Sequence, residues 1–67
     1  MISLNGKPAE LPADGTVTGV LRSLGVPEEA RGVAVAVDGE VVPRGDWAAR
    51  ELRDGAHVEV LTAMQGG

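Results

Sequence analysis

Residues 33–42 read VAVAVDGEVV, and this stretch decides the fold. Its first five residues are all apolar, which predicts a central strand covered on both faces, or on one face together with a partner. Asp38-Gly39 predicts a tight hairpin turn, and Glu40 to Val42 predicts the antiparallel return strand. Pro43 ends that strand because it has no N–H to donate to a sheet. The middle of the chain is therefore expected to be a β-hairpin.

The first residues of the chain predict a second hairpin. Residues 2–5 alternate between apolar and polar side chains, which is typical of a half-buried strand. Asn5-Gly6 follows, and this dipeptide is the strongest short-range signal of a hairpin turn. A second short strand is expected over about residues 8–11, with Pro8 at its start or on a sheet edge.

A helix is expected between the two hairpins. Thr16 is placed to cap its N-terminus, because the hydroxyl can accept a hydrogen bond from an otherwise unpaired backbone N–H. Gly25 is a natural end for the helix, and Pro27 prevents its continuation. The helix would carry an apolar stripe made of Val17, Val20, Leu21 and Leu24.

After the central hairpin, a short helical turn and a final strand are expected. Asp46 is placed to cap the turn, which would run to Arg50. Residues 57–61 alternate again, with Val58 and Val60 on one face and His57, Glu59 and Leu61 on the other. The element order predicts an α+β domain over residues 1–61, a small mixed sheet covered by one main helix and a short helix. With the first strand beside the last, this would be a β-grasp (ubiquitin-like) fold, followed by a tail over residues 62–67.

Composition limits the possible functions of these 67 residues. So short a domain has little volume for an enzyme cleft, which favours a carrier or a binding module over an enzyme. The absence of cysteine excludes disulfides and cysteine nucleophiles and favours a cytoplasmic setting. The net charge of −4 argues against nucleic acid as a partner. No apolar run approaches the roughly 20 residues of a membrane helix, so no membrane association is expected.

The last two residues, Gly66-Gly67, are the strongest candidate for chemistry. Without Cβ atoms the backbone is slim and can pass through a narrow channel into the active site of another protein. Residues 62–67 would reach about 20 Å when fully extended. The terminal carboxylate becomes reactive once it is converted to an acyl-adenylate, which a sulfur nucleophile can then attack. The chain would supply only this reactive end, and other enzymes would supply the catalysis.

Several motifs together resemble the ThiS family of sulfur carriers in thiamine biosynthesis, over essentially the whole chain. They are Asn5-Gly6, residues 33–37, Val41-Val42-Pro43-Arg44 with Trp47, Asp54-Gly55, Val58-Glu59-Val60, and Ala63-Met64-Gln65-Gly66-Gly67. Met64 stands where the tail of this family often has Val.

The resemblance implies a β-grasp fold and a defined set of reactions. Gly67 would be adenylated by an activating enzyme of the ThiF kind, which uses ATP, while the carrier itself binds no cofactor and no metal. A sulfur donor enzyme would then supply the sulfur of a thiocarboxylate on Gly67. The loaded carrier would pass this sulfur to thiazole synthase (ThiG), with Gly66 and Gln65 threading into each partner.

Three other functions stay open from the sequence. A final Gly-Gly also fits the small subunit of molybdopterin synthase or a ubiquitin-like protein modifier, and an inert tail would leave a plain interaction module. Leu61 and Met64 are candidates for a docking surface near the tail, although the helix or a neighbouring strand could equally cover Leu61. His57 is interpreted as a solvent-facing strand residue, Trp47 as a core plug and Arg44 as a solvated surface residue.

Overall fold

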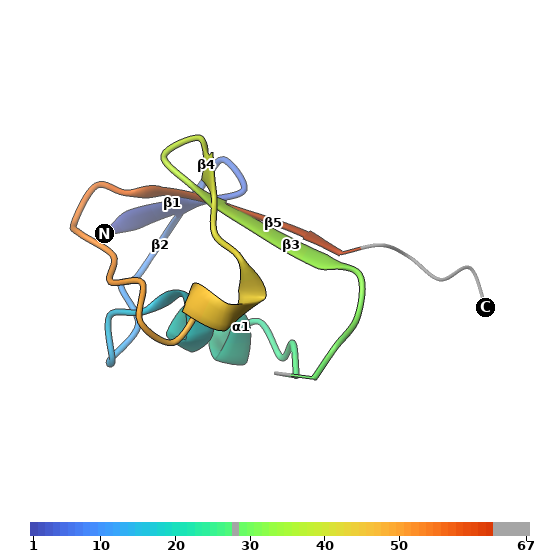
Figure 1. The fold of residues 1–67 in the computed structure, drawn as a ribbon. Coiled ribbons are helices and arrows are strands. Elements are labelled where there is room, and N and C mark those ends of the chain that lie inside the picture. The colour runs from blue at the N-terminus through green and yellow to red at the C-terminus, as the bar shows by residue number, and fades with distance from the viewer. Residues whose placement is uncertain (28, 63–67) are drawn as a thin grey trace.

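The strand nearest the C-terminus lies at the centre of a five-stranded sheet (Figure 1). The computed structural model describes residues 1–27 and 29–62. The strand order is β2-β1-β5-β3-β4, with β1 and β5 parallel and every other neighbouring pair antiparallel. The strands are β1 (Ile2–Leu4), β2 (Lys7–Ala9), β3 (Val33–Val37), β4 (Glu40–Val41) and β5 (His57–Thr62). The predicted mixed sheet, with its first strand beside its last, is confirmed.

One face of this sheet is covered and the other is open. Helix α1 (Val17–Ser23) and the short 3₁₀ helix η1 (Arg44–Asp46) lie on the same side of the sheet (Figure 1). The core between the helices and the sheet consists of Ile2, Val17, Val20, Leu21, Val35, Val37, Val42, Trp47, Leu52, Ala56, Val58 and Val60. A single buried layer of this kind confirms the predicted α+β architecture.

The structure corrects the expectation for residues 33–37. Val35 and Val37 are buried, whereas Ala34 is exposed and Ala36 is half-buried, so β3 is covered on one face only. Nor is β3 the central strand, because β5 separates it from β1. The unbroken apolar run reflects alanines on the open face, where a small side chain costs little when it is exposed to water.

Helix α1 begins as expected. The Thr16 side chain caps it, since its Oγ1 accepts a hydrogen bond from the Gly19 N–H at 3.2 Å.

The predicted end of the helix at Gly25 is confirmed, but Leu24 is 46% exposed and does not belong to the buried stripe. The helix ends at Ser23, and a Schellman motif follows, with Gly25 at φ +77°. In this motif the Val26 N–H donates to the Leu21 carbonyl at 2.9 Å, and Val26 packs against the core in place of Leu24.

Two further boundaries differ from the prediction. The second strand covers Lys7–Ala9 rather than residues 8–11. The short helix begins at Arg44, directly after Pro43, and Asp46 ends it instead of capping it. Both shifts are small because the turn residues that bound these elements were correctly placed.

Trp47 fills the space beneath η1, as predicted, and is only 5% exposed. Its Nε1–H donates to the Val42 carbonyl at 2.9 Å. The Arg44 guanidinium lies 4.6 Å from the centroid of the Trp47 ring and donates to the Ala30 carbonyl. Arg44 is exposed, as predicted for a solvated surface residue, and its guanidinium also lies against the Trp47 ring.

The described helices include none that is long and apolar enough to cross a membrane.

Candidate functional site

The predicted reactive tail continues directly from the central strand. β5 runs through Thr62, which pairs with Val33 of β3, so the strand includes the first residue assigned to the tail from the sequence. Met64, Gln65, Gly66 and Gly67 lie outside the described residues. The described body therefore contributes the strand from which the tail continues and the surface around the end of that strand.

Leu61, the one predicted site residue within the described part, is 69% exposed. Leu61 of β5 pairs with Ala34 of β3. The next pair on the same face of these two strands is Glu59 with Ala36. Among the described residues neither the helix nor a neighbouring strand covers Leu61, and its role in docking stays a prediction. An exposed leucine beside the end of β5 is available to a docking partner.

Leu61 belongs to an apolar patch on the open face of the sheet. Register partners share a face, so Val41 of β4 lies on the same face as Ala36. Val41 is 72% exposed. We call Ala34, Ala36, Val41 and Leu61 the open-face patch. The sequence analysis found only Leu61, although the alternation of β3 and β4 around the Asp38-Gly39 turn contained the signal for the other three.

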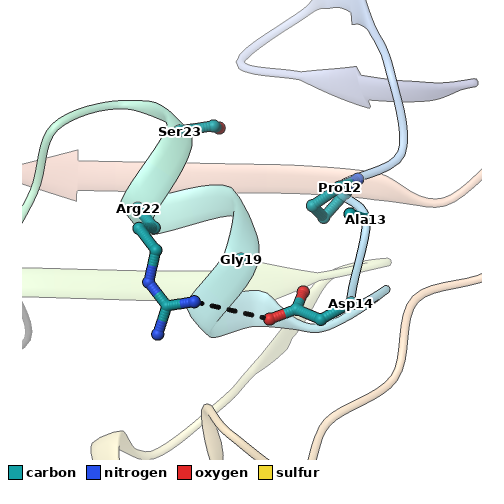
Figure 2. A pocket seen from close by; sticks show the side chains of 6 residues that line it. All are labelled: Pro12, Ala13, Asp14, Gly19, Arg22 and Ser23. Atoms are coloured by element: carbon teal, nitrogen blue, oxygen red, sulfur yellow. Dashed lines mark ion pairs between the residues drawn. The ribbon is translucent and has the colours of Figure 1, made fainter.

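A separate hollow of about 340 Å³ lies between helix α1 and the loop that precedes it (Figure 2). It is lined by Pro12, Ala13, Asp14, Gly19, Arg22 and Ser23. Figure 2 shows Arg22 directed toward Asp14, and their charged groups lie 3.9 Å apart. A Cβ on Gly19 would lie 2.9 Å from the Pro12 Cβ, so the loop can approach the helix only because residue 19 is glycine. This hollow serves the packing of the helix start and involves no residue of β5.

A carboxyl with a lowered pKa, that of Asp54, lies before the start of β5. The Met1 ammonium donates a hydrogen bond to Asp54, and this contact lowers the pKa of the Asp54 carboxyl. His57 is an exposed strand residue, as predicted. Within residues 1–27 and 29–62, no three His, Cys, Asp or Glu side chains gather so that they could hold a metal ion. The described body thus offers an exposed apolar patch and a strand end.

A model of the ThiS family matches residues 2–67. The chain belongs to the ThiS family. The match includes the strand β5, the exposed Leu61 and the final Gly66-Gly67. The family resemblance given by the sequence motifs is therefore confirmed.

Relatives of this ThiS family member agree with it in length and in fold. The sulfur carrier protein ThiS of Thermus thermophilus is 43% identical over 67 residues, which is the whole of both chains. The crystal structure of the thiamine biosynthesis protein ThiS from Geobacter metallireducens has a TM-score of 0.75 at 37% identity and covers 98% of this chain and 97% of that one. A solution structure of a thiamine biosynthesis protein from the same organism has a TM-score of 0.76 at 37% identity and covers 98% of this chain and 86% of that one.

Proposed function

We propose that this ThiS family member carries sulfur for the thiazole-forming step of thiamine biosynthesis. The observation that carries the proposal is the full-length match to a protein named as a sulfur carrier. The last two residues, Gly66-Gly67, also form the slim terminus that a threading tail requires. The protein acts through its tail, and catalysis belongs to its partner enzymes.

The proposed chemistry takes place at the Gly67 carboxylate. One carboxylate oxygen attacks the α-phosphorus of ATP, and pyrophosphate leaves, which gives an acyl-adenylate. A sulfur nucleophile, delivered by a sulfur donor enzyme, then attacks the acyl carbon, and AMP leaves. The resulting thiocarboxylate is a soft nucleophile that thiazole synthase uses as its sulfur source. ATP is a substrate of the activating enzyme, and the carrier needs no cofactor of its own.

The folded body docks on each partner while the tail reaches into the active site. The open-face patch supports this division of work, because its exposed leucine lies within two residues of the end of β5. An activating enzyme of the ThiF kind and thiazole synthase are the two docking partners of the proposal. A cytoplasmic setting, predicted from the lack of cysteine, remains part of the same proposal.

The first prediction concerns the mass of the carrier. After incubation with an adenylating enzyme, ATP and a sulfur donor, the intact mass should rise by the difference between one sulfur and one oxygen. As a control, the intact mass should not rise when ATP is omitted. An unchanged mass in the complete reaction would contradict the proposal. The loaded carrier should then supply sulfur to thiazole synthase, and transfer only to a molybdopterin-synthase large subunit would leave sulfur carriage but overturn the thiazole assignment.

A second prediction tests the open-face patch. Leu61→Ser should raise the KM of the activating enzyme for the carrier about tenfold, because burying a leucine side chain at an interface is worth at least that much. The kcat should change little, since the tail is intact. Steady-state pyrophosphate release measures both parameters.

Leu24→Ser is the matched control for Leu61→Ser. Leu24 is also an exposed leucine, 46% accessible, but it lies at the end of α1 on the covered side of the sheet. The KM of the activating enzyme for the Leu24→Ser carrier should stay within about twofold of the parent value, as expected for a surface change outside an interface. Equal KM values for the two variants would show that the open-face patch does not dock.

A further inference from the structure

The side chains of two turn residues form hydrogen bonds with strand β5, and we call each of these sets of hydrogen bonds a grip. Asn5 and Asp38 each begin an X-Gly hairpin turn, and each has φ +51°. Among the described residues they are the only non-glycine positions with positive φ. Asn5 follows β1 and Asp38 follows β3, the two strands that flank β5. The central strand is thus held from both sides by side chains as well as by its ladders.

The carboxamide of Asn5 takes the place of a peptide group. In a continued parallel ladder, the Val60 N–H and carbonyl would pair with the backbone of β1. The chain turns away at Asn5, and its side chain makes both bonds instead. The Val60 N–H donates to Asn5 Oδ1 at 2.8 Å, and Asn5 Nδ2 donates to the Val60 carbonyl at 3.2 Å. Only an amide offers a donor and an acceptor in this arrangement.

Asp38 makes the corresponding grip at the opposite end of β5. Its backbone N–H donates to the His57 carbonyl at 2.7 Å. The His57 N–H donates in return to Asp38 Oδ1 at 2.9 Å. The two turn residues therefore share the same φ and bind the same strand, but Asp38 binds its first residue whereas Asn5 binds Val60, two residues before its end.

We infer that Asn5 is a positioning residue for the reactive tail, an inference that rests on the proposed function. The Asn5 grip is the last described contact on the β1 side of β5. Beyond it, within the described residues, Leu61 and Thr62 are paired only with Ala34 and Val33 of β3. The grip at Val60 therefore sets the direction in which the chain leaves the sheet toward Gly67.

Loss of this grip should slow the activation step. A strand end held on one side samples more directions, and the activating enzyme must restrict them again before Gly67 reaches the ATP. Ordering one backbone residue changes an equilibrium constant by about a factor of ten. The open-face patch is unaffected, so the loss should fall on kcat and not on KM.

The experiment compares Asn5→Gly with Asp38→Gly. Glycine accepts positive φ without strain, so each variant removes a side-chain grip and keeps its turn. Denaturant titration measures the global stability of both variants. Pyrophosphate release with the activating enzyme gives kcat and KM, and amide hydrogen exchange is followed at Val60 and Leu61.

Asn5→Gly should lower kcat about tenfold, with KM within about twofold, and should speed exchange at Val60 and Leu61. Asp38→Gly should lower the free energy of unfolding but should leave kcat and the exchange at Val60 and Leu61 unchanged. Equal kcat values for the two variants, or equal exchange at Leu61, would overturn the inference. Failure of the parent protein to be adenylated would reject the proposed function, and exchange at Leu61 would then decide by itself whether Asn5 fixes the strand end.

Discussion

Deletion of Gly67 is expected to abolish loading of the carrier and to leave the fold intact. The deletion shortens the reach of the tail by about 3.3 Å. A misplacement of about 1 Å at a reacting group can already cost a factor of a hundred, so adenylation should fall at least that far. Intact mass should show no sulfur gain, and pyrophosphate release should drop to background. The free energy of unfolding should change by less than about 0.5 kcal/mol.

Gly67→Ala is the matched control for this deletion, because it keeps the reach and adds only a Cβ. It should retain more activity than the deletion if reach dominates, and equally little if the channel tolerates no side chain. Adenylation of the deleted chain at the parent rate would contradict the assignment of Gly67 as the reacting residue. The open-face patch is the same in the parent, the deletion and Gly67→Ala. A difference in adenylation between them therefore comes from the end of the chain and not from docking.

Trp47→Ala is expected to have the largest effect on stability. Truncation of a buried tryptophan costs about 3–5 kcal/mol. A domain of this size is stable by roughly 3–10 kcal/mol in total. The variant also leaves the Val42 carbonyl without its donor and removes the ring on which Arg44 lies. The variant should therefore lose about a third or more of the total stability of the domain.

Urea titration followed by far-ultraviolet circular dichroism measures the stability of this variant, since the chain has no other aromatic residue to report by fluorescence. Val41→Ala is the control, because Val41 is 72% exposed and its truncation should change the free energy of unfolding by less than about 0.5 kcal/mol. A loss below about 1 kcal/mol for Trp47→Ala would mean that the space beneath η1 collapses without cost.

Features that depend on neighbouring residues could be predicted from the sequence. The Asn5-Gly6 and Asp38-Gly39 turns, the Thr16 cap and the alternation of β5 each follow from local backbone chemistry. The end of the helix at Gly25 was predicted correctly, but Leu24 was wrongly assigned to the apolar stripe, because the apolar spacing continued past Ser23, the last residue of the helix. Val26 of the Schellman motif packs against the core, while Leu24 is exposed.

Features that depend on distant pairing could not be predicted in the same way. The alternation of Val and Ala separates the two faces of β3, but which of these faces is open is decided by where α1 lies. The grip of Asn5 on Val60 joins positions 55 residues apart. The Asn-Gly pair was interpreted as a turn, which it is, but its side chain has a second task that turn chemistry alone does not reveal. The reactive end was predicted from Gly66-Gly67 and the family motifs, and remains a proposal.

The central place of β5 has a consequence for the order of synthesis. A ribosome makes β1, β2, α1, β3 and β4 before it makes β5, yet β5 joins the two halves of the sheet. Until then the nascent chain holds two separate hairpins, and an isolated hairpin is marginally stable at best in water. Folding therefore cannot be completed from the N-terminus while translation proceeds. Folding is completed only once β5 has been made, so a product that ends before β5 would leave the apolar residues of its core exposed.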